Sequence, residues 1–512
     1  MERVWRVVFH RVTVIVLLIL VQIAALVFAV LKFDEDFVYF YVFCFALSVV
    51  AVLCIINNKS NPAYKIAWII PILALPIFGG LFYLFFNGDK LRFRSRKRMK
   101  EVNRDFVEGM DLNSGVLEEI AAQDSKAGNQ SRYIEKFAQC PPYRNTVTEY
   151  LPSGEIKFKF LLEELRNAKH YIFLEYFIIE EGKMWNSVLH ILQEKARRGV
   201  EVRVIYDDMG SLLTLPANYK AKLEDLGVKC CVFNPFVPVL SLQFNYRDHR
   251  KICVIDGVTG FMGGINLADE YINVRKKHGH WKDTAILLKG DAVWSLVVMF
   301  LSMWGYVNKI KEDYNEFRPR ELPSLPQEQS AGYVQPYTDS PLDDEAVGET
   351  VYLNLINKAE RYVYINTPYL ILSNEMITAL CAAAKGGVDV RIVTPHIGDK
   401  WFVHSVTRAH YGPLVEAGVK IYEYSPGFIH AKSFVVDGEY GVVGSINLDY
   451  RSLYLHFESA VWLYRTNSIA QLLEDYQKCL ELCEEVTLQD IRSVKWYQRL
   501  TRSVLRVFAP LM

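Results

Sequence analysis

The amino-acid sequence predicts an α/β protein in which N-terminal transmembrane helices are followed by two similar α/β halves. Three observations predict this arrangement. Three long apolar runs lie within the first 86 residues, short runs rich in Val, Ile and Tyr alternate with helical stretches after residue 100, and one octet occurs twice, as HRKICVID (249–256) and HAKSFVVD (430–437). Alternating strand-like and helical segments are typical of α/β domains. A chain of 512 residues is long enough for a membrane region and two such halves.

The three apolar runs cover residues 12–31, 37–56 and 66–86. A helix of about twenty residues is about 30 Å long, which is the thickness of the hydrocarbon core of a bilayer. We therefore expect residues 1–100 to form a membrane region. Two prolines and two glycines interrupt the third run. The sequence leaves open whether that run crosses the bilayer or forms a bent segment that does not cross.

Lysine and arginine are concentrated at the end of this region. Seven of them lie between residues 90 and 100, and residues 1–100 carry 13 Lys and Arg against 5 Asp and Glu, whereas the rest of the chain carries 45 against 53. Positive flanks favour the cytoplasmic side of a membrane. We expect a multi-pass protein of the cell membrane with both halves on the cytoplasmic side and the basic cluster on anionic headgroups. The acidic balance after residue 100 argues against a nucleic-acid partner.

The repeat extends beyond the octets. AKHYIFLEYF (168–177) aligns with AERYVYINTP (359–368) at an offset of 191 residues, whereas the octets are 181 residues apart. The first half therefore carries ten additional residues, at or near FVPVLSLQFN (236–245). From these alignments and the prolines between the repeats we expect a first half at 101–318, a linker at 319–347, a second half at 348–490 and a tail at 491–512.

Each octet has the pattern of a β-strand that begins a hairpin. His249 and Lys251 are two residues apart, as are His430 and Lys432, so within each pair the side chains point to one face of a strand. Both octets end in Asp followed by Gly, which is a hairpin-turn signal. The second arms of the two hairpins then end in GGIN (263–266) and GSIN (444–447).

His, Lys and Asn at these spacings fit a phosphate site. Lysine supplies a positive charge and asparagine an amide donor, and two facing sets surround one phosphorus atom without a metal. One imidazole can attack the phosphorus while the other protonates the leaving alcohol, which gives two-step transfer through a phosphohistidine. For Asp256 and Asp437, the role of a turn former competes with any contact to imidazole.

The duplicated H-x-K-x4-D followed by G-[GS]-x-N resembles the signature of the phospholipase D superfamily. Two longer segments, NYRDHRKICVIDG (245–257) and GVKIYEYSPGFIHAKSFVVDGEYGVVGSINLDYRSLYLHFE (418–458), are similar to bacterial cardiolipin synthases. The resemblance implies two phospholipase D-like α/β halves with the active site at their interface. It implies condensation of two phosphatidylglycerols into cardiolipin and glycerol, with no cofactor and with His249 as the nucleophile. The implied catalytic residues are His249, Lys251, Asp256, His430, Lys432 and Asp437, and the implied phosphate contacts are Asn266 and Asn447.

In this superfamily a carboxylate near the imidazole often follows the motif Asp by twenty-one residues. Glu458 has this spacing in the second half. In the first half the corresponding position 277 is Lys, and the nearest candidate is Asp283.

Other functions use the same residues. A hydrolytic phospholipase D would use water as the acceptor, and the octets do not separate a hydrolase from a synthase. The apolar runs argue against a nuclease, and the two intact octets argue against a membrane scaffold with an inactive site. The sequence also leaves open the oligomeric state and the use of other lipid donors or alcohol acceptors.

The tail has the pattern of a basic amphipathic helix. Over residues 491–508, basic residues recur at intervals of three and four, and apolar residues lie largely elsewhere on the helical wheel. We expect a helix that lies on the membrane surface and orients the halves. The alternative is a solvated helix packed on the second half.

Overall fold

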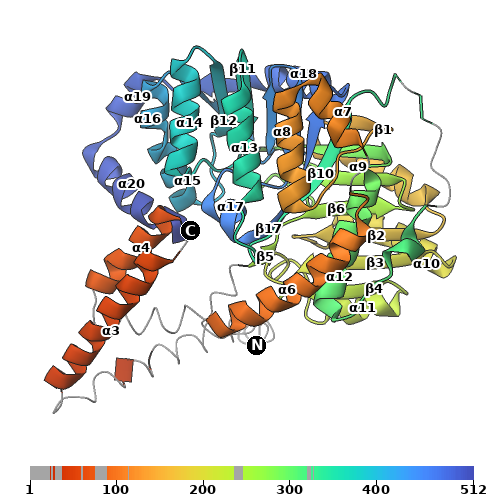
Figure 1. Cartoon of the computed structure of the whole chain (residues 1–512), viewed down its shortest axis with the longest axis horizontal. Coiled ribbons are helices and arrows are strands. Elements are labelled where there is room, and N and C mark those ends of the chain that lie inside the picture. The colour runs from red at the N-terminus through yellow and green to blue at the C-terminus, as the bar shows by residue number, and fades with distance from the viewer. Residues whose placement is uncertain are drawn as a thin grey trace.

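Residues 24, 27–28, 37–58, 61–74, 89–112, 115–235, 246–319, 325–326 and 328–511 are described by the structure, which is a computed structural model. Figure 1 shows two α/β halves side by side, with α3 (Phe37–Asn57) and α4 (Pro62–Ala74) extending from one end. The α/β class and the two similar halves predicted from the sequence are therefore confirmed.

Each half contains one mixed β-sheet. The first sheet has the order β1-β9-β7-β6-β2-β3-β4, and the second has β10-β17-β16-β15-β11-β12-β13 followed by β18. The first sheet consists of β1 (Thr146–Leu151), β2 (Tyr171–Tyr176), β3 (Glu201–Asp207), β4 (Lys229–Phe233), β6 (Lys251–Ile255), β7 (Thr259–Gly263) and β9 (Ala285–Gly290). The second consists of β10 (Tyr333–Asp339), β11 (Tyr362–Asn366), β12 (Asp389–Pro395), β13 (Lys420–Tyr424), β15 (Ser433–Val436), β16 (Tyr440–Gly444), β17 (His456–Tyr464) and β18 (Cys483–Glu485). The orders match strand for strand, so the sequence repeat is also a structural repeat.

The octets form the hairpins that the sequence predicts. β6 pairs antiparallel with β7, and β15 pairs antiparallel with β16. The turns contain Asp256 and Asp437 at φ of 53° and 55°, and the glycines that follow also have positive φ. Positive φ at two successive residues is the requirement that Asp-Gly meets in a tight hairpin.

Two short parallel pairings join the halves. β5 (Arg247–Asp248) pairs with the first residues of β17, and β8 (His280–Lys282) pairs with β14 (Gly427–Ile429). Each pairing lies next to one of the octet histidines, so these crossings decide what the histidines face.

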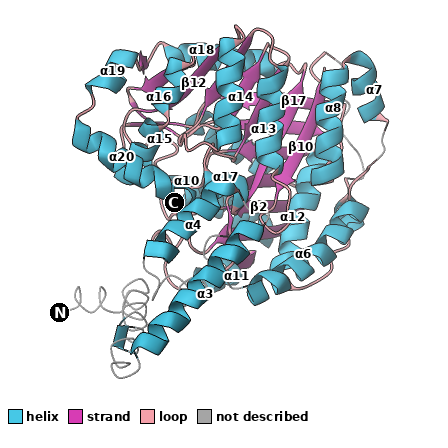
Figure 2. Ribbon diagram, turned by 60° about the vertical axis from the view of Figure 1, so that its left-hand side comes forward, coloured by secondary structure: helices cyan, strands magenta, loops and turns pink. Residues whose placement is uncertain are grey.

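Helices cover both faces of the sheets (Figure 2). In the first half they are α6 (Asp89–Gly109), α7 (Val116–Gln123), α8 (Ser125–Tyr133), the π-helix η1 (Ile134–Ala138), α9 (Gly154–Asn167), α10 (Lys183–Arg197), α11 (Tyr219–Asp225), α12 (Val293–Asn308) and η3 (Tyr314–Phe317). In the second half they are α13 (Val347–Lys358), α14 (Asn374–Lys385), α15 (Trp401–Ala409), α16 (Tyr411–Glu416), α17 (Tyr450–Tyr454), α18 (Ser468–Leu480), α19 (Leu488–Ser493), α20 (Trp496–Phe508) and η4 (Ala509–Leu511).

The core is shared between the halves. α12 is apolar almost all round and is buried from Val293 to Met299 without a break, because it contacts β2 and β6 of the first sheet and β10 of the second. In return α18 packs on β1, where Thr148 Oγ1 donates to Ser468 Oγ at 2.8 Å. The two halves therefore form one continuous body.

The segment between the halves is shorter than the predicted linker 319–347. β10 occupies Tyr333–Asp339 within it and pairs with β17. The prolines that indicated a linker include Pro336, which lies in this strand. Proline is tolerated there because β10 is at the edge of its sheet and one side of it needs no backbone donor.

Residues 491–508 do not form one helix. The chain is extended at Val494 (φ −60°, ψ 127°), between α19 and α20, so only the second part of the predicted amphipathic stretch is continuous helix. The predicted insertion at 236–245 lies outside the described residues.

The predicted transmembrane helices are not seen in the described part of the chain. No helix among the described residues has both the length and the apolar character of a membrane span. Run 12–31 lies almost wholly outside those residues, run 37–56 forms α3, and run 66–86 is described only to Ala74 in α4. In the basic cluster, Arg96 binds Asp344 at 2.7 Å and Arg98 donates to the carbonyl of Tyr306, so these two side chains contact the protein itself.

Candidate active site

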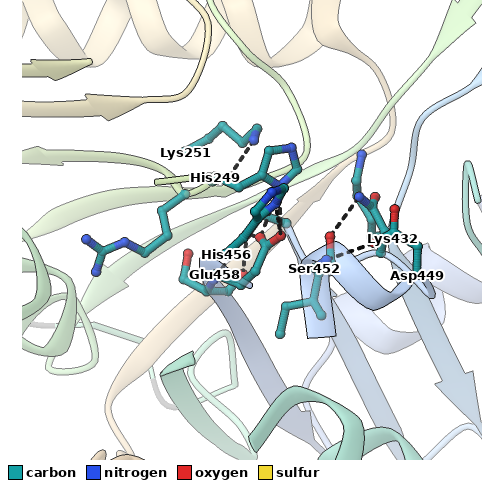
Figure 3. A network of polar contacts seen from close by, with 12 residues as sticks. His249, Lys251, Lys432, Asp449, Ser452, His456 and Glu458 are labelled. Atoms are coloured by element: carbon teal, nitrogen blue, oxygen red, sulfur yellow. Dashed lines mark hydrogen bonds and ion pairs between the residues drawn. The ribbon is translucent and has the colours of Figure 1, made fainter. Parts of the chain in front are cut away.

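The first octet histidine reaches the second half through β5. His249 follows β5, and its backbone N–H donates to the carbonyl of Phe457 at 2.9 Å, which continues the pairing of β5 with β17. His249 Nδ1 therefore lies 2.9 and 3.1 Å from the two carboxylate oxygens of Glu458 (Figure 3). A carboxylate accepts hydrogen bonds, so this contact holds the imidazole hydrogen on Nδ1 and leaves the lone pair on Nε2.

The second octet histidine is placed in the same way by β8 and β14. The backbone N–H of His430 donates to the carbonyl of Lys282 at 2.6 Å, and His430 Nδ1 lies 2.7 Å from Asp283 Oδ2. A Cβ atom at Gly264 would lie 2.2 Å from Asp283 Oδ1, so glycine leaves the room that this carboxylate needs. The corresponding residue of the second half is Ser445, whose hydroxyl donates to Glu458.

Asp283 and Glu458 are equivalent positions of the repeat. Gly263 pairs with Ala285 and Gly444 pairs with Ala460, and each carboxylate stands two residues before its alanine. Both carboxylates are fully buried. Each histidine therefore faces the carboxylate of the other half, and neither half contains a complete site.

The octet lysines lie beside the histidines. The ammonium groups of Lys251 and Lys432 donate to the carbonyl oxygens of His249 and His430, and Lys432 Nζ also lies 2.7 Å from His430 Nδ1. Burial lowers the pKa of Lys251 to about 7 and that of Lys432 to about 8, against the opposing attraction of the nearby carboxylates. A phosphate anion bound between them would stabilise their charged forms.

Both histidines are held in the neutral form near pH 7. Burial, reinforced by the positive charges of Lys251 and Lys432, lowers the pKa of His249 well below its usual value. Burial and the charge of Lys432 lower the pKa of His430 to about 4, although Asp283 opposes the shift. A neutral imidazole with its hydrogen on Nδ1 is a nucleophile at Nε2.

Asp256 and Asp437 lie away from the imidazoles. The carboxylate of Asp256 accepts backbone N–H groups of Lys169, His170 and Tyr171 at 2.7, 2.7 and 2.8 Å. The carboxylate of Asp437 accepts those of residues 360, 361 and 362 at 2.7, 2.8 and 2.8 Å. The sequence left open whether these aspartates form turns or contact an imidazole, and the contacts seen are those of turn residues. Asp256 holds the start of β2 against its hairpin, and Asp437 holds the start of β11.

The two asparagines are held by the residue five positions later. Asn266 Nδ2 donates to the hydroxyl of Tyr271 at 2.7 Å, and Asn447 Nδ2 donates to that of Ser452 at 2.9 Å. Asn266 Oδ1 accepts the backbone N–H of Ile178 at 3.0 Å. The buried Asn447 Oδ1 has no hydrogen-bond partner among the described residues.

The sequence reasoning missed His456. Its ring lies 5.5 Å from that of His249, and its Nδ1 is 3.8 Å from Glu458 Oε1. The equivalent residue of the first half is Trp281, whose ring lies 5.4 Å from that of His430. The signal was present, because His456 precedes Glu458 by two residues and so shares its side of the strand.

One group of side chains in the described part of the chain could hold a metal ion. Donor atoms of His249, His456 and Glu458 lie within 4.8 Å of one another. Two imidazoles and a carboxylate suit Zn²⁺. The same contacts already orient His249, however, and the lysines supply positive charge without a metal.

The chain matches the family described as "Cardiolipin synthase, PLD-like domain" over residues 161–286 and 352–480, and the family described as "Phospholipase_D-nuclease N-terminal" over residues 46–87. The two matched segments of the first family correspond to the two halves of the structure. Each includes one octet.

Relatives and a solved structure agree with these matches. The chain is 34% identical over 480 residues to the cardiolipin synthase of Alkalihalophilus pseudofirmus, which covers 91% of this chain and 93% of that protein. It is 43% identical over 462 residues to an uncharacterized protein of Streptococcus mutans, over 90% of this chain and 99% of that one. The crystal structure of phosphatidylserine synthase from Haemophilus influenzae has the same fold, with a TM-score of 0.54, 15% identity, and coverage of 75% of this chain and 97% of that one. The chain therefore belongs to the cardiolipin synthase family within the phospholipase D superfamily.

Proposed function

We propose that the protein transfers a phosphatidyl group from one phosphatidylglycerol to another, giving cardiolipin and glycerol. The observation that carries this proposal is the pair of buried histidines, each with Nδ1 on a carboxylate of the other half and a lysine beside it. This arrangement provides two equivalent imidazoles for one phosphorus atom. The choice of lipid is supported by the relatives named cardiolipin synthase.

In the first step His249 Nε2 attacks the phosphorus of one phosphatidylglycerol. The bond from phosphorus to the headgroup glycerol oxygen breaks, and His430 gives that oxygen a proton. The bound phosphodiester anion raises the low pKa of His430, so His430 takes up a proton from solvent when the lipid binds and can donate it in this step. Lys251 and Lys432 balance the charge that develops on the non-bridging oxygens.

In the second step a hydroxyl of the second phosphatidylglycerol attacks the same phosphorus. His430 accepts the proton of this hydroxyl, the phosphorus–nitrogen bond breaks, and His249 leaves with its lone pair restored. One glycerol is released for each cardiolipin formed. Water in place of the second lipid would give phosphatidic acid, the product of a hydrolytic phospholipase D.

We further propose that the N-terminal region holds the chain in the cell membrane with the halves on the cytoplasmic side. The apolar runs, the lysine and arginine distribution and the exposed apolar side chains of α3, such as Tyr39, Phe43 and Leu53, support this. Resistance of the full chain to alkaline extraction, with a C-terminal tag digested only in inverted membrane vesicles, is the expected result. A tag digested in right-side-out vesicles would contradict the orientation.

The reaction is tested with purified full-length protein and phosphatidylglycerol, by measuring cardiolipin, phosphatidic acid and free glycerol. We expect equal amounts of cardiolipin and glycerol. His430→Asn should abolish both, whereas His190→Asn, on the exposed face of α10, should not change them. Formation of phosphatidic acid without cardiolipin would contradict the synthase activity and show that the protein is a hydrolytic phospholipase D.

The identity of the nucleophile is tested separately. Acid quench during turnover of lipid labelled at phosphorus should leave the label on His249. Label on His430 would reverse the two roles while keeping the two-step reaction.

A further inference from the structure

The apolar stripe of α20 faces away from the protein. Trp496, Leu500 and Val504 are 76%, 57% and 51% exposed, and Val507 is also exposed. Intervals of four, four and three residues place them on one face of the helix. A soluble helix normally turns such a face toward the core, so this orientation needs a partner.

A different face of α20 attaches the helix to the protein. Leu505 packs on a small apolar cluster that includes Val403 and Val406 of α15. Arg502 of α20 is half-buried next to α15. The attachment leaves the apolar stripe outside. The orientation of α20 is therefore fixed by packing.

The two helices that α20 packs against also carry exposed apolar side chains. α20 packs against α15 and α4, and Figures 1 and 2 show α20, α4 and the C-terminus together at the end of the molecule from which α3 extends. On α15, Trp401 is 70% exposed, and Ile70 and Leu73 of α4 are exposed as well. The exposed apolar residues of α20 thus belong to a helix that packs against α4, the helix that follows α3 in the chain.

Positive charge flanks the stripe. Arg499 and Arg506 are exposed on the side of α20 next to the apolar residues. Exposed apolar residues beside arginines are the pattern of a helix at the interface of an anionic bilayer, where the apolar side enters the acyl region and arginine binds headgroups. A protein partner would not require this charge.

We infer that α20, with Trp401 and the exposed face of α4, docks on an anionic lipid surface and turns the active site toward it. α17 joins this surface to the site. Tyr450 and Tyr454 of α17 pack in the same apolar cluster as Leu505, and Ser452 holds the amide of Asn447. This inference rests on the proposed function only in taking the substrate to be a membrane lipid.

Docking is tested with the full chain reconstituted in vesicles of phosphatidylcholine and phosphatidylserine, with and without brominated acyl chains. Bromine should quench the tryptophan fluorescence of the parent more than that of Trp496→Phe. The difference should shrink in phosphatidylcholine alone, because each arginine at an anionic surface contributes about fivefold in affinity. Equal quenching of parent and variant in the anionic vesicles would overturn the inference, and this readout does not depend on any enzymatic activity.

The effect on turnover is tested with a matched pair of variants. Leu500→Gln/Val504→Gln/Val507→Gln should lower cardiolipin formation on bilayers by about fivefold or more and leave it unchanged in detergent micelles. Asn186→Gln/His190→Gln/Glu194→Gln introduces the same three side chains at exposed positions of α10 and should change neither. If the α20 variant instead converts a dimer in detergent to a monomer, the stripe is a contact between two copies and the lipid assignment is wrong.

Discussion

At the scale of single residues, the two equivalent imidazoles have different surroundings. His249 faces Glu458 and His456, whereas His430 faces Asp283 and Trp281. Beside its carboxylate, His249 has a second imidazole as a neighbour, whereas His430 has an indole. In the repeat, a carboxylate therefore orients each of the two imidazoles in the same way, but the other neighbouring ring differs. This difference is a physical basis for different roles of His249 and His430 in the two steps.

Glu458 and Asp256 should respond differently to removal of charge. Glu458→Gln removes the negative charge and turns one of the two acceptor oxygens near His249 Nδ1 into an amide donor, so the hydrogen on Nδ1 is no longer fixed and kcat should fall on the order of a thousandfold with little change in Tm. Asp256→Asn removes an acceptor of backbone N–H groups at the start of β2, so the free energy of unfolding should fall by about 1–3 kcal/mol. Thermal melting and turnover measured on both variants check this. A large loss of kcat in Asp256→Asn without a loss of stability would place that carboxylate in the chemistry.

The lysines should set an alkaline limit on activity. Burial lowers the pKa of Lys251 to about 7 and that of Lys432 to about 8, so their charges are present below these values and are lost as pH rises through them. Because the substrate is an anion, kcat/KM should fall as pH rises past about 7, and more steeply past about 8. The pKa of His430, about 4, keeps this imidazole neutral well into the acid range in the free protein, so the protonated form that the first step needs should arise only when the lipid anion is bound.

Lys432→Arg is the control for this pH profile. Arginine keeps its charge throughout the range, so only the loss of charge at Lys251 remains, and kcat/KM should fall less steeply above pH 8 than in the parent. A fall near the usual pKa of lysine in the parent would show that burial does not shift these groups.

Chelation should leave turnover unchanged. Lys251 and Lys432 supply the positive charge that a metal would otherwise bring to the phosphate. Activity after exhaustive treatment with EDTA and gel filtration checks this. A complete loss that Mg²⁺ or Zn²⁺ restores would mean that the donor group of His249, His456 and Glu458 holds a required ion.

At the scale of elements, the sequence predicted the strands and their hairpins but not how the halves interlock. The octets with Asp-Gly specify β6–β7 and β15–β16 through local turn chemistry. The pairings β5–β17 and β8–β14 involve two or three residues each and have no local signal of that kind. For this reason Glu458 and Asp283 could be chosen from the sequence as carboxylates near an imidazole, whereas the exchange between halves became visible only in the structure.

Gly427 tests the importance of one such crossing. A Cβ atom there would lie 2.4 Å from the backbone N and O of His280. Gly427→Ala should therefore separate β14 from β8, move His430 away from Asp283 and lower kcat at least about tenfold, because small displacements of a catalytic group are costly. Turnover and the pH profile of kcat are the measurements.

The control is Gly412→Ala in helix α16, where the nearest atom to an added Cβ lies 3.9 Å away. This change should leave turnover unchanged and raise stability slightly, by up to about 1 kcal/mol. Unchanged kcat in Gly427→Ala would show that the contact of His430 with Asp283 does not depend on the β8–β14 pairing.

At the scale of the whole molecule, the halves are joined by more than the site. α12 lies against both sheets, and α18 of the second half packs on β1 of the first. The predicted boundaries treated the halves as separate units because composition shows where prolines and charges lie, not which faces pack together. Pro336 is the clearest example, since it was one of the prolines that predicted a linker and it lies in the edge strand β10.

Because both crossings occur within one chain, each molecule should contain one complete site. A chain with His249→Asn lacks the nucleophile and a chain with His430→Asn lacks the acid and base, so each variant alone should be inactive. When the two variants are co-expressed with different affinity tags and purified together, the mixture should also be inactive, since no molecule holds both histidines. If two chains instead exchanged halves to build shared sites, each mixed pair would hold one intact site of two and recover activity of up to about a half of the parent. Cardiolipin formation by the tandem-purified mixture, compared with the parent carrying the same tags, decides between a site within one chain and a site shared by two.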